Sequence, residues 1–383
     1  MFEHLEKLVG RRATEIDTPA LVIDLDAMAR NLARMAAFAS QHQVRLRPHA
    51  KMHKSAVLAS MQMAAGAVGV CAQKTAEAEC LAAGGVTDIF ISNEVISPAK
   101  LARVAVLAQR LAQAGGRLSI AVDSAMGITR LATAMAAAET RIDVFIEIDV
   151  GQRRCGVLPG APALALAQQI ALHPLLRFAG LQAYHGAAQH FRTAAERRAA
   201  IKRVTHEVAE TVALLEAQGF AVDLVTGAGT GTFSLEAGSG VFGELQAGSY
   251  LFMDADYARN EGDAAQPGFE HALFVKAQVM SASATHVVVD AGHKSHAVDS
   301  GLPIVWGFGA DAGLEVIACS DESAVIKSVI GATLPALGDI VWLIPGHCDP
   351  TVNLHDTMIG VRGGLQQGVV ERIIKVDARG ALT

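Results

Sequence analysis

Aromatic residues, paired cysteines and long apolar runs are all scarce in this chain of 383 residues. Phe, Trp and Tyr make up only 5% of it, and its five cysteines are widely spread and form no CxxC pair. An odd number of dispersed cysteines argues against a disulfide framework or a structural zinc site. Because no uninterrupted apolar run approaches about 18 residues, we expect no membrane-spanning helix.

An excess of basic charge is also missing. Lys and Arg together number 32 against 38 for Asp and Glu, which gives a net charge of −6. This balance predicts neither a nucleic-acid-binding surface nor a basic membrane face. The first residues, MFEHLEKLVGRR, lack the apolar region and cleavage site of a secretory signal. We therefore expect a cytoplasmic protein whose partner is a small molecule.

Short apolar runs alternate with longer Ala- and Leu-rich runs of helical period from about residue 44. This alternation is typical of repeated βα units around a parallel sheet. Eight strands are predicted, at residues 44–50, 67–72, 88–92, 118–122, 143–149, 178–184, 222–227 and 244–252. Eight such units fit a (β/α)8 TIM barrel, with a doubly wound open sheet as the competing α/β fold.

The pattern changes beyond about residue 268, where strand-like runs follow one another without long helical runs between them. We expect a barrel over residues 18–258 and a C-terminal β domain over 268–383. Residues 18–24 also read as a strand, so the N-terminal segment, about residues 1–25, is expected to complete the β domain. The stretch 259–269, rich in Gly, Pro and charge, is the predicted linker.

Residues suited to chemistry stand at the carboxyl ends of the predicted strands, where barrels place their active sites. Lys51 follows the first strand, within a basic run that could by itself be a solvated edge. The seventh strand leads into TGAGTGTF (226–233), which lacks the GK[ST] of a P-loop but stands where barrels form phosphate sites. A lysine facing such a loop is what pyridoxal phosphate requires, and nearby Arg and His side chains would favour its free amine.

Six motifs in order resemble those of the fold-type III pyridoxal-phosphate enzymes, within them the D-threonine aldolase and D-serine dehydratase-like family. They are RPHAKMHK (47–54), CAQKTAEAE (71–79), DVGQRRCGV (149–157), YHG (184–186), TGAGTGTF (226–233) and PGHCDPTVN (345–353). The resemblance covers essentially the whole chain. It implies a (β/α)8 barrel with a β domain, pyridoxal phosphate as cofactor, and a homodimer in which both subunits shape each active site.

The resemblance also assigns roles to individual residues. Lys51 would be the Schiff-base lysine, Arg154 would contact the phenolic oxygen of the cofactor with Gln73 nearby, and Tyr184 would lie at the pyridine ring. The phosphate is assigned to Thr226, Gly229 and Thr230, with help from Tyr250.

The HCD motif, residues 347–349, decides between two reactions within the family. His347 and Asp349 could bind one divalent metal from a loop or strand. In the dehydratase-like members the second ligand is a cysteine and the metal is zinc, whereas aldolase-like members have aspartate there. Oxygen ligation favours manganese or magnesium. His190 is expected near the water molecules of the metal or the substrate hydroxyl, although it could also be a surface histidine at a helix start.

These motifs predict retro-aldol cleavage of a D-β-hydroxy amino acid, of the D-threonine or 3-hydroxy-D-aspartate type, to glycine and an aldehyde. The D configuration follows from the resemblance. One alternative is dehydration of D-serine or 3-hydroxy-D-aspartate on the same scaffold. Chemistry like that of alanine racemase would not need His347 and Asp349. A non-catalytic carrier of pyridoxal phosphate would not need the β domain.

Overall fold

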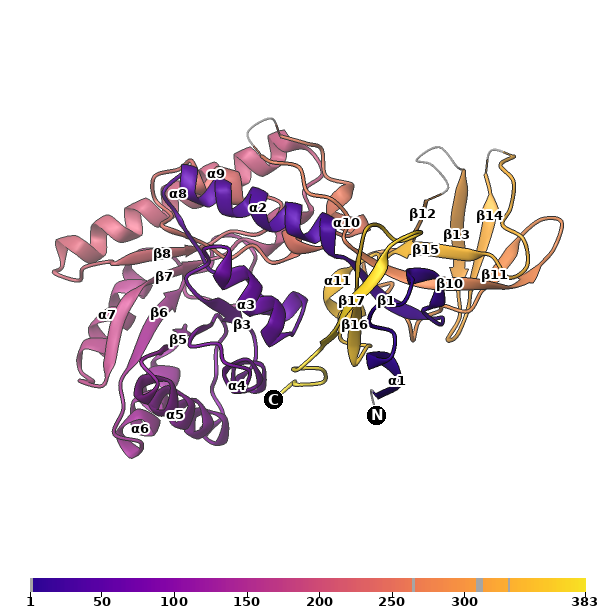
Figure 1. Cartoon of the computed structure of the whole chain (residues 1–383). Helices are drawn as coiled ribbons and strands as arrows, with labels where there is room; N and C mark the ends of the chain where they lie inside the picture. Colours follow the sequence, from indigo (N-terminus) through magenta and orange to yellow (C-terminus); the bar gives the residue numbers. More distant parts are fainter. Residues whose placement is uncertain (1–2, 264–265, 308–312, 330) are drawn as a thin grey trace.

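The computed structural model describes residues 3–263, 266–307, 313–329 and 331–383. Two bodies make up the molecule, a parallel sheet surrounded by helices and a second sheet built mostly from the C-terminal third of the chain (Figure 1). The first body is called the barrel below, and the second the β domain. This arrangement confirms the predicted fold class.

Eight parallel strands form the barrel in the order β2-β9-β8-β7-β6-β5-β4-β3, and each overlaps a predicted strand. They are β2 (Arg45–Leu46), β3 (Val70–Ala72), β4 (Asp88–Ile91), β5 (Arg117–Val122), β6 (Ile142–Glu147), β7 (Leu176–Ala183), β8 (Leu224–Gly227) and β9 (Glu244–Leu245). Between β2 and β3 the backbone N–H of Val68 donates to Leu46, and that of Cys71 to Pro48, both at 2.9 Å. These bonds join the two ends of the sheet, so the open-sheet alternative does not hold.

Helices cover the outside of the barrel, and they form where apolar residues recur at helical spacing in the sequence. They are α2 (Leu25–Gln41), α3 (Ala56–Ala64), α4 (Thr75–Ala83), α5 (Pro98–Gln113), α6 (Ala125–Ala137), α7 (Ala161–Ala171), α8 (Ala194–Ala217) and α9 (Phe233–Ala237). In α5 the buried Leu101, Val104 and Leu111 share one face, whereas Val106 on the opposite face is 62% exposed. Within the described residues, no helix is both long and apolar enough to cross a bilayer.

Two phenylalanines fill the inside of the barrel. The rings of Phe90 and Phe145 lie 4.8 Å apart between centroids and pack with Cys71, Ala121 and Ala179. Small residues around two large rings fill a closed barrel without leaving a void. The scarcity of aromatic residues is therefore compatible with a packed barrel interior.

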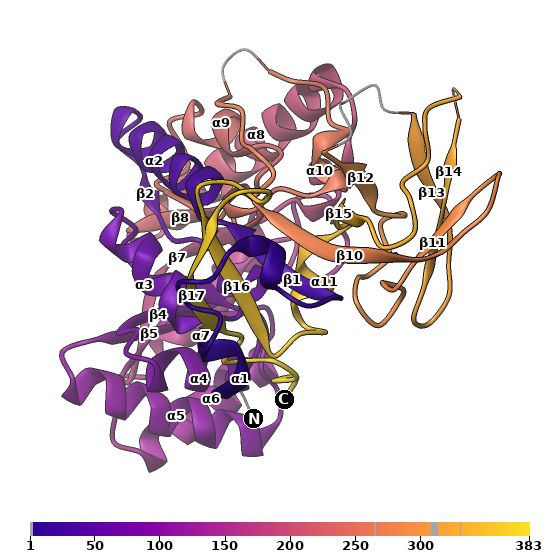
Figure 2. The same cartoon turned by 45° about the vertical axis from the view of Figure 1, so that its right-hand side comes forward.

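The β domain is a nine-stranded sheet that the N-terminal strand completes. Its strands are β1 (Ala20–Asp24), β10 (Leu273–Ala282), β11 (Val287–Val289), β12 (Ile304–Trp306), β13 (Leu314–Cys319), β14 (Ala324–Ser328), β15 (Ile340–Ile344), β16 (Thr357–Arg362) and β17 (Val369–Lys375). Strand β1 pairs antiparallel with β10 and parallel with β16, which confirms that the N-terminal segment belongs to this sheet (Figure 2).

The two predicted domains overlap at residues 18–25, and the structure shows where these residues lie. Strand β1 belongs to the sheet of the β domain, and α2, which starts at Leu25, lies on the barrel. Short helices α1 (Glu3–Glu6), α10 (Ala255–Ala258) and α11 (Cys348–Val352) complete the regular structure. Of the predicted linker, residues 264–265 lie outside the described part of the chain.

A buried group of ion pairs ties Arg47, which follows β2, to strands β9 and β4. The side chain of Arg47 is 5% exposed, and it lies 3.1 Å from Glu244 Oε1 and 2.6 Å from Asp88 Oδ1. We expect Arg47→Met to lower the free energy of unfolding by about 3 kcal/mol, because it removes the buried partner of Glu244 and leaves that carboxylate only the part-exposed guanidinium of Arg45, at 3.2 Å. Urea unfolding measures this change. Arg117→Met, at a half-exposed partner of Asp88, is the control and should cost less than about 1 kcal/mol. Equal losses in both variants would contradict this view of Arg47.

Candidate active site

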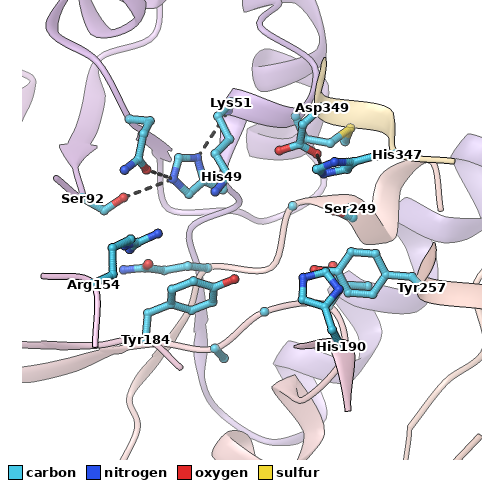
Figure 3. A pocket seen from close by; sticks show the side chains of 17 residues that line it. His49, Lys51, Ser92, Arg154, Tyr184, His190, Ser249, Tyr257, His347 and Asp349 are labelled. Atoms are coloured by element: carbon cyan, nitrogen blue, oxygen red, sulfur yellow. Dashed lines mark hydrogen bonds and ion pairs between the residues drawn. The ribbon is translucent and has the colours of Figure 1, made fainter. Parts of the chain in front are cut away.

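A pocket opens at the carboxyl ends of the barrel strands, next to the β domain (Figure 3). The barrel supplies most of its lining, and His347 and Asp349 of the β domain complete it. Nine of the eleven residues predicted from the sequence line this pocket: Lys51, Gln73, Arg154, Tyr184, His190, Gly229, Thr230, His347 and Asp349. The structure thus brings the predicted cofactor lysine and the predicted metal pair to one cavity.

Thr226 and Tyr250 do not line the pocket, although both were predicted to hold a phosphate. The hydroxyl of Thr226 donates to Glu244 Oε1 at 3.0 Å, within the barrel. Tyr250 is fully buried, and its hydroxyl accepts a hydrogen bond from Gln62 at 3.2 Å. Only the backbone N–H of Tyr250 reaches the predicted loop, where it donates to Thr230 Oγ1 at 3.0 Å. Both side chains therefore support the pocket wall from behind.

Lys51 lies in a 3₁₀ turn, residues Ala50–Met52, just beyond the end of β2. The backbone N–H of Lys51 donates to Nδ1 of His49 at 3.3 Å, and Nε2 of the same ring bonds to Gln73 Oε1 at 3.0 Å. Because Nδ1 accepts, Nε2 carries the proton. Burial, followed by the nearby charge of Lys51, holds the pKa of His49 well below its usual range. His49 is therefore a neutral ring, and its hydrogen bond to the backbone of Lys51 stabilises the turn that carries this lysine.

The loop after β8 offers free hydrogen-bond donors to the pocket. In the part of the chain that the structure describes, the backbone N–H groups of Gly229 and Thr230 donate to no other protein group. A Cβ added at Gly229 would come within 2.5 Å of Gln189 Oε1, which instead accepts the N–H of Gly231 at 2.9 Å. Glycine is thus required for this close approach. Two free amides beside the hydroxyl of Thr230 make a cradle for an anion such as phosphate.

Arg154 and Tyr184 lie together on the wall of the pocket. The guanidinium of Arg154 is 5.9 Å from the centroid of the Tyr184 ring, a distance at which a cation is attracted to the ring face. Burial raises the pKa of Tyr184 to about 12, so its hydroxyl remains a neutral phenol. The wall therefore presents one fixed positive charge and one flat aromatic ring to a ligand.

His347 and Asp349 form the part of the pocket suited to a metal. His347 immediately precedes α11 and Asp349 stands in its first turn, so the motif lies at a helix start and not on a loop or strand alone. Nε2 of His347 is 3.6 Å from Asp349 Oδ2, an atom that is buried and has no hydrogen-bond partner among the described residues. Nδ1 of His347 bonds to Asp299 Oδ2 at 2.7 Å, which orients Nε2 toward the pocket. An unpaired buried carboxylate oxygen next to a free imidazole nitrogen fits a divalent cation.

His190 reaches the pocket from the end of a 3₁₀ turn, residues Gly186–His190, after β7. Its Nδ1 bonds to Asp256 Oδ2 at 2.6 Å. Burial would raise the pKa of Asp256, but the ion pairs with Arg192 and His190 outweigh it and lower the pKa. The ionised carboxylate accepts the Nδ1 proton, so Nε2 is left free to take up another proton. The contact with Asp256 therefore fixes the ring of His190 in the pocket that His347 and Asp349 also line.

Asp254 connects the segment that carries Asp256 to the HCD motif, residues 347–349. Its carboxylate is fully buried and accepts the backbone N–H groups of Tyr257 and Cys348, each at 3.0 Å. Backbone bonds from Ala255 to Pro345 (3.0 Å) and from Asp256 to Gly346 (3.2 Å) reinforce the junction. The partner of His190 and the segment that carries His347 and Asp349 therefore form one connected unit between the barrel and the β domain.

Several lining residues were not predicted from the sequence: His49, Met52, Ser92, Ala228, Gln246, Gly248, Ser249 and Tyr257. His49 had a signal, since it stands two residues before Lys51 at the same strand end. Tyr257 had none, because it lies on α10, beyond the last barrel strand. Its hydroxyl bonds to Ser249, and burial holds its pKa well above the usual range.

The residues that meet in the pocket fit both groups that the sequence predicts. Lys51, the amides of Gly229 and Thr230, and the ring of Tyr184 match the aldehyde, phosphate and ring of pyridoxal phosphate. The unpaired oxygen of Asp349 and the oriented His347 match a metal ion. Because both sets line one cavity, the arrangement can act on two atoms of the same bound molecule.

Comparison with known proteins agrees with this geometry. The family described as "Alanine racemase, N-terminal domain" matches residues 23–256, and the "Putative serine dehydratase domain" matches 272–361. A D-threonine aldolase from an Arthrobacter species is 47% identical over 97% of this chain and 95% of its own length. A 3-hydroxy-D-aspartate aldolase from Paracoccus denitrificans is 43% identical with the same coverage. A solved structure of D-threonine aldolase from Filomicrobium marinum superposes with a TM-score of 0.94 at 47% identity, covering 98% of this chain and 99% of that one.

Identity of this extent over nearly the full length of each relative shows common family membership, and the matched fold includes both the barrel and the β domain. The resemblance read from the six motifs is confirmed. The chain belongs to the alanine-racemase-like family of pyridoxal-phosphate enzymes, in the D-threonine aldolase and D-serine dehydratase-like group that includes D-threonine aldolase and 3-hydroxy-D-aspartate aldolase.

Proposed function

We propose that this protein cleaves a D-β-hydroxy amino acid, of the D-threonine or 3-hydroxy-D-aspartate type, into glycine and an aldehyde, using pyridoxal phosphate and a divalent metal. The observation that carries the proposal is the presence of Lys51 and the pair His347 and Asp349 in one pocket. The names of its relatives, D-threonine aldolase and 3-hydroxy-D-aspartate aldolase, support the same reaction. In this proposal the cofactor and the metal act on adjacent carbon atoms of the substrate.

The barrel residues would hold and orient the cofactor. Lys51 would bind its aldehyde carbon, and the free amides of Gly229 and Thr230 would bind its phosphate. Arg154 would neutralise its phenolic oxygen, and Tyr184 would limit tilting of its ring. When bound, pyridoxal phosphate supplies an electron sink for the carbon that loses its bond.

The metal ligands in this proposal are His347 and Asp349. When bound, a divalent ion supplies a Lewis acid that lowers the pKa of a hydroxyl group. Cys348 stands between the two ligands, but it is fully buried, and its thiol donates to the carbonyl of Met253 at 3.5 Å. Burial holds its pKa well above the usual range, so it offers no thiolate. One carboxylate and one imidazole favour manganese or magnesium over a thiolate-bound zinc.

His190 would remove the proton of the substrate β-hydroxyl through its free Nε2. We expect His190→Ala to lower kcat by about a hundredfold, the usual contribution of a general base. Steady-state assays with a D-β-hydroxy amino acid measure this loss. His206→Ala, at an exposed histidine on α8, is the matched control and should retain full activity. Unchanged kcat in His190→Ala would assign the base to a metal-bound water.

A second candidate reaction is dehydration of D-serine or 3-hydroxy-D-aspartate, because residues 272–361 match the putative serine dehydratase domain. The two reactions differ in their products, so one assay separates them. D- and L-forms of threonine, 3-hydroxyaspartate, phenylserine and serine should be incubated with the protein. Glycine and an aldehyde from D-substrates alone would support the aldolase. Ammonia and an α-keto acid as main products would replace it with the dehydratase.

We also propose a homodimer in which the β domain of the partner covers the pocket mouth. The β domain carries exposed apolar side chains: Ile304 (42%) and Trp306 (37%) of β12, Ile317 (42%) of β13 and Leu337 (68%) before β15. Among the described strands, β12 pairs only with β15. Burial of these side chains would stabilise association, and a covered mouth would exclude water. Analytical ultracentrifugation should find a dimer at micromolar concentration. A fully active monomer would contradict the proposal.

A further inference from the structure

A cluster of carboxyl groups lies behind Arg154 at the ends of three adjacent barrel strands. Glu94 follows β4, Asp123 follows β5 and Glu147 is the last residue of β6. Ligand atoms of Glu94, Asp123 and Cys155 lie within 4.8 Å of one another. Of these four side chains, only Glu147 forms an ion pair with Arg154. The function proposed above assigns no role to this cluster.

The carboxyl groups have too few hydrogen-bond donors for all of them to be ionised. Glu147 is 4% exposed, and its Oε1 lies 3.8 Å from Nη2 of Arg154. Its Oε2 and both carboxyl oxygens of Glu94 are buried and accept no hydrogen bond from any described residue. Two buried carboxylates without donors repel each other strongly, whereas one shared proton gives each of them a partner. Burial and the neighbouring Glu94 accordingly raise the pKa of Glu147.

We propose that Glu147 and Glu94 share one proton and that this singly charged pair holds the guanidinium of Arg154 in place over Tyr184. Glu147 is then a positioning residue, which acts on the cofactor only through Arg154. The contact of Arg154 with the cofactor rests on the proposed function, but the shared proton does not. A proton-sharing pair keeps one negative charge beside Arg154, enough to orient it without cancelling its positive field in the pocket.

Other charges that face the pair favour a proton over a metal ion. Arg154 already supplies a cation next to Glu147, and a second cation would be repelled. Asp123 accepts the backbone N–H of Gly156 at 3.2 Å, so one of its oxygens is occupied. Burial and the neighbouring Glu94 raise the pKa of Cys155 to about 12, which keeps it a neutral thiol and a poor ligand.

The first test follows stability against pH in the full-length protein treated with EDTA. A group whose pKa is raised in the folded state stabilises the fold at low pH, and this stability is lost as pH rises through the folded pKa. The wild type should therefore lose stability as the pH rises from the ordinary pKa of Glu147, 4.5, to its folded pKa of about 9. Glu147→Gln cannot ionise, so its melting temperature should exceed that of the wild type by about 2 °C at the alkaline end and equal it at the acidic end. Glu216→Gln, at an exposed residue of α8, should follow the wild type throughout.

The second test measures binding of pyridoxal phosphate by absorbance titration. Glu147→Ala removes the group that orients Arg154, and we expect the dissociation constant to rise about tenfold, as for other residues that orient ligands from behind. Glu147→Gln keeps the shape and a hydrogen bond to Glu94, so it should restore most of the affinity. A residue with a purely structural role would not show this split between Gln and Ala at equal stability.

Three results would overturn the proposal. An identical loss of stability with pH in Glu147→Gln and in the wild type would show that Glu147 and Glu94 share no proton. Equal cofactor affinity in Glu147→Ala and the wild type would show that Glu147 does not position Arg154 for cofactor binding. If manganese, magnesium or zinc abolished the loss of melting temperature that the wild type shows at alkaline pH, the cluster would be a cation site. If no cofactor binds to the wild type at all, the proposed function fails, while the pH test still decides on the shared proton.

Discussion

Lys51→Ala should abolish cleavage of D-β-hydroxy amino acids and leave no cofactor attached to the chain after borohydride reduction. Lys51 is the lysine that lines the pocket, together with Gly229 and Thr230, whose amides are free among the described residues. Without its amine the cofactor has no covalent anchor, and the substrate loses the exchange step that admits it. We expect activity below the detection limit. Mass spectrometry of the reduced, digested protein locates the modified residue.

Lys202→Ala is the matched control, since Lys202 is exposed on α8 and does not line the pocket. It should retain both the activity and the reducible bond. Lys54 is the nearest alternative in sequence, but its amine is bound to Asn353 at 2.9 Å and lies 3.2 Å from Glu77. Cofactor fixed to Lys54 or Lys74 in the wild type would refute the assignment of Lys51.

Removal of the metal should stop carbon–carbon cleavage and leave the cofactor bound. The proposed ion has two protein ligands, His347 and Asp349, and its remaining positions would be water, so EDTA should remove it readily. Asp349→Ala should lower kcat about a thousandfold, the loss expected when several kcal/mol of Lewis-acid assistance disappear. The absorbance of the bound cofactor should not change, because Lys51 stands on the barrel and Asp349 on the β domain.

Manganese, and to a lesser degree magnesium, should restore the chelated wild type but not Asp349→Ala. Asp356→Ala serves as the control, because Asp356 lies shortly after α11, is about half exposed and pairs only with Arg379 among the described residues. It should keep full activity and full response to manganese. Full activity of the chelated wild type, or ammonia as the main product with zinc bound, would exclude the aldolase mechanism.

The sequence predicts the barrel well because its signals are local and repeat. Each barrel strand is a short apolar run followed by a helix with a regular apolar face, so all eight positions can be read from periodicity. The ends of parallel strands then meet by geometry alone, which is why residues as distant as Lys51 and Tyr184 were expected together. The prediction of His347 and Asp349 as metal ligands depended on the family resemblance, since the pattern HxD by itself is common.

What the sequence does not show depends on contacts between distant segments. Strand β16 has a glycine at 360, and β17 carries charges at 371 and 372, so neither gives a clear apolar alternation. Thr226 and Tyr250 stand in the expected segments, but tertiary packing turns their side chains away from the pocket. The carboxylates that orient the histidines have no sequence motif of their own: Asp256 lies in the short helix α10 and Asp299 in a turn.

Strand β1 has a consequence for the order in which the molecule assembles. Its residues Ala20–Ile23 pair with β10, and Val22–Asp24 pair with β16, so both partners are synthesised after the whole barrel. During translation the barrel segment can begin to fold while β1 remains an unpaired edge. The β domain closes only when the last strands leave the ribosome, and closure also delivers His347 and Asp349 to the pocket. The pocket that combines Lys51 with His347 and Asp349 is therefore completed late in biosynthesis. A chain that stops before β16 would contain Lys51 but neither a complete sheet nor its final contacts.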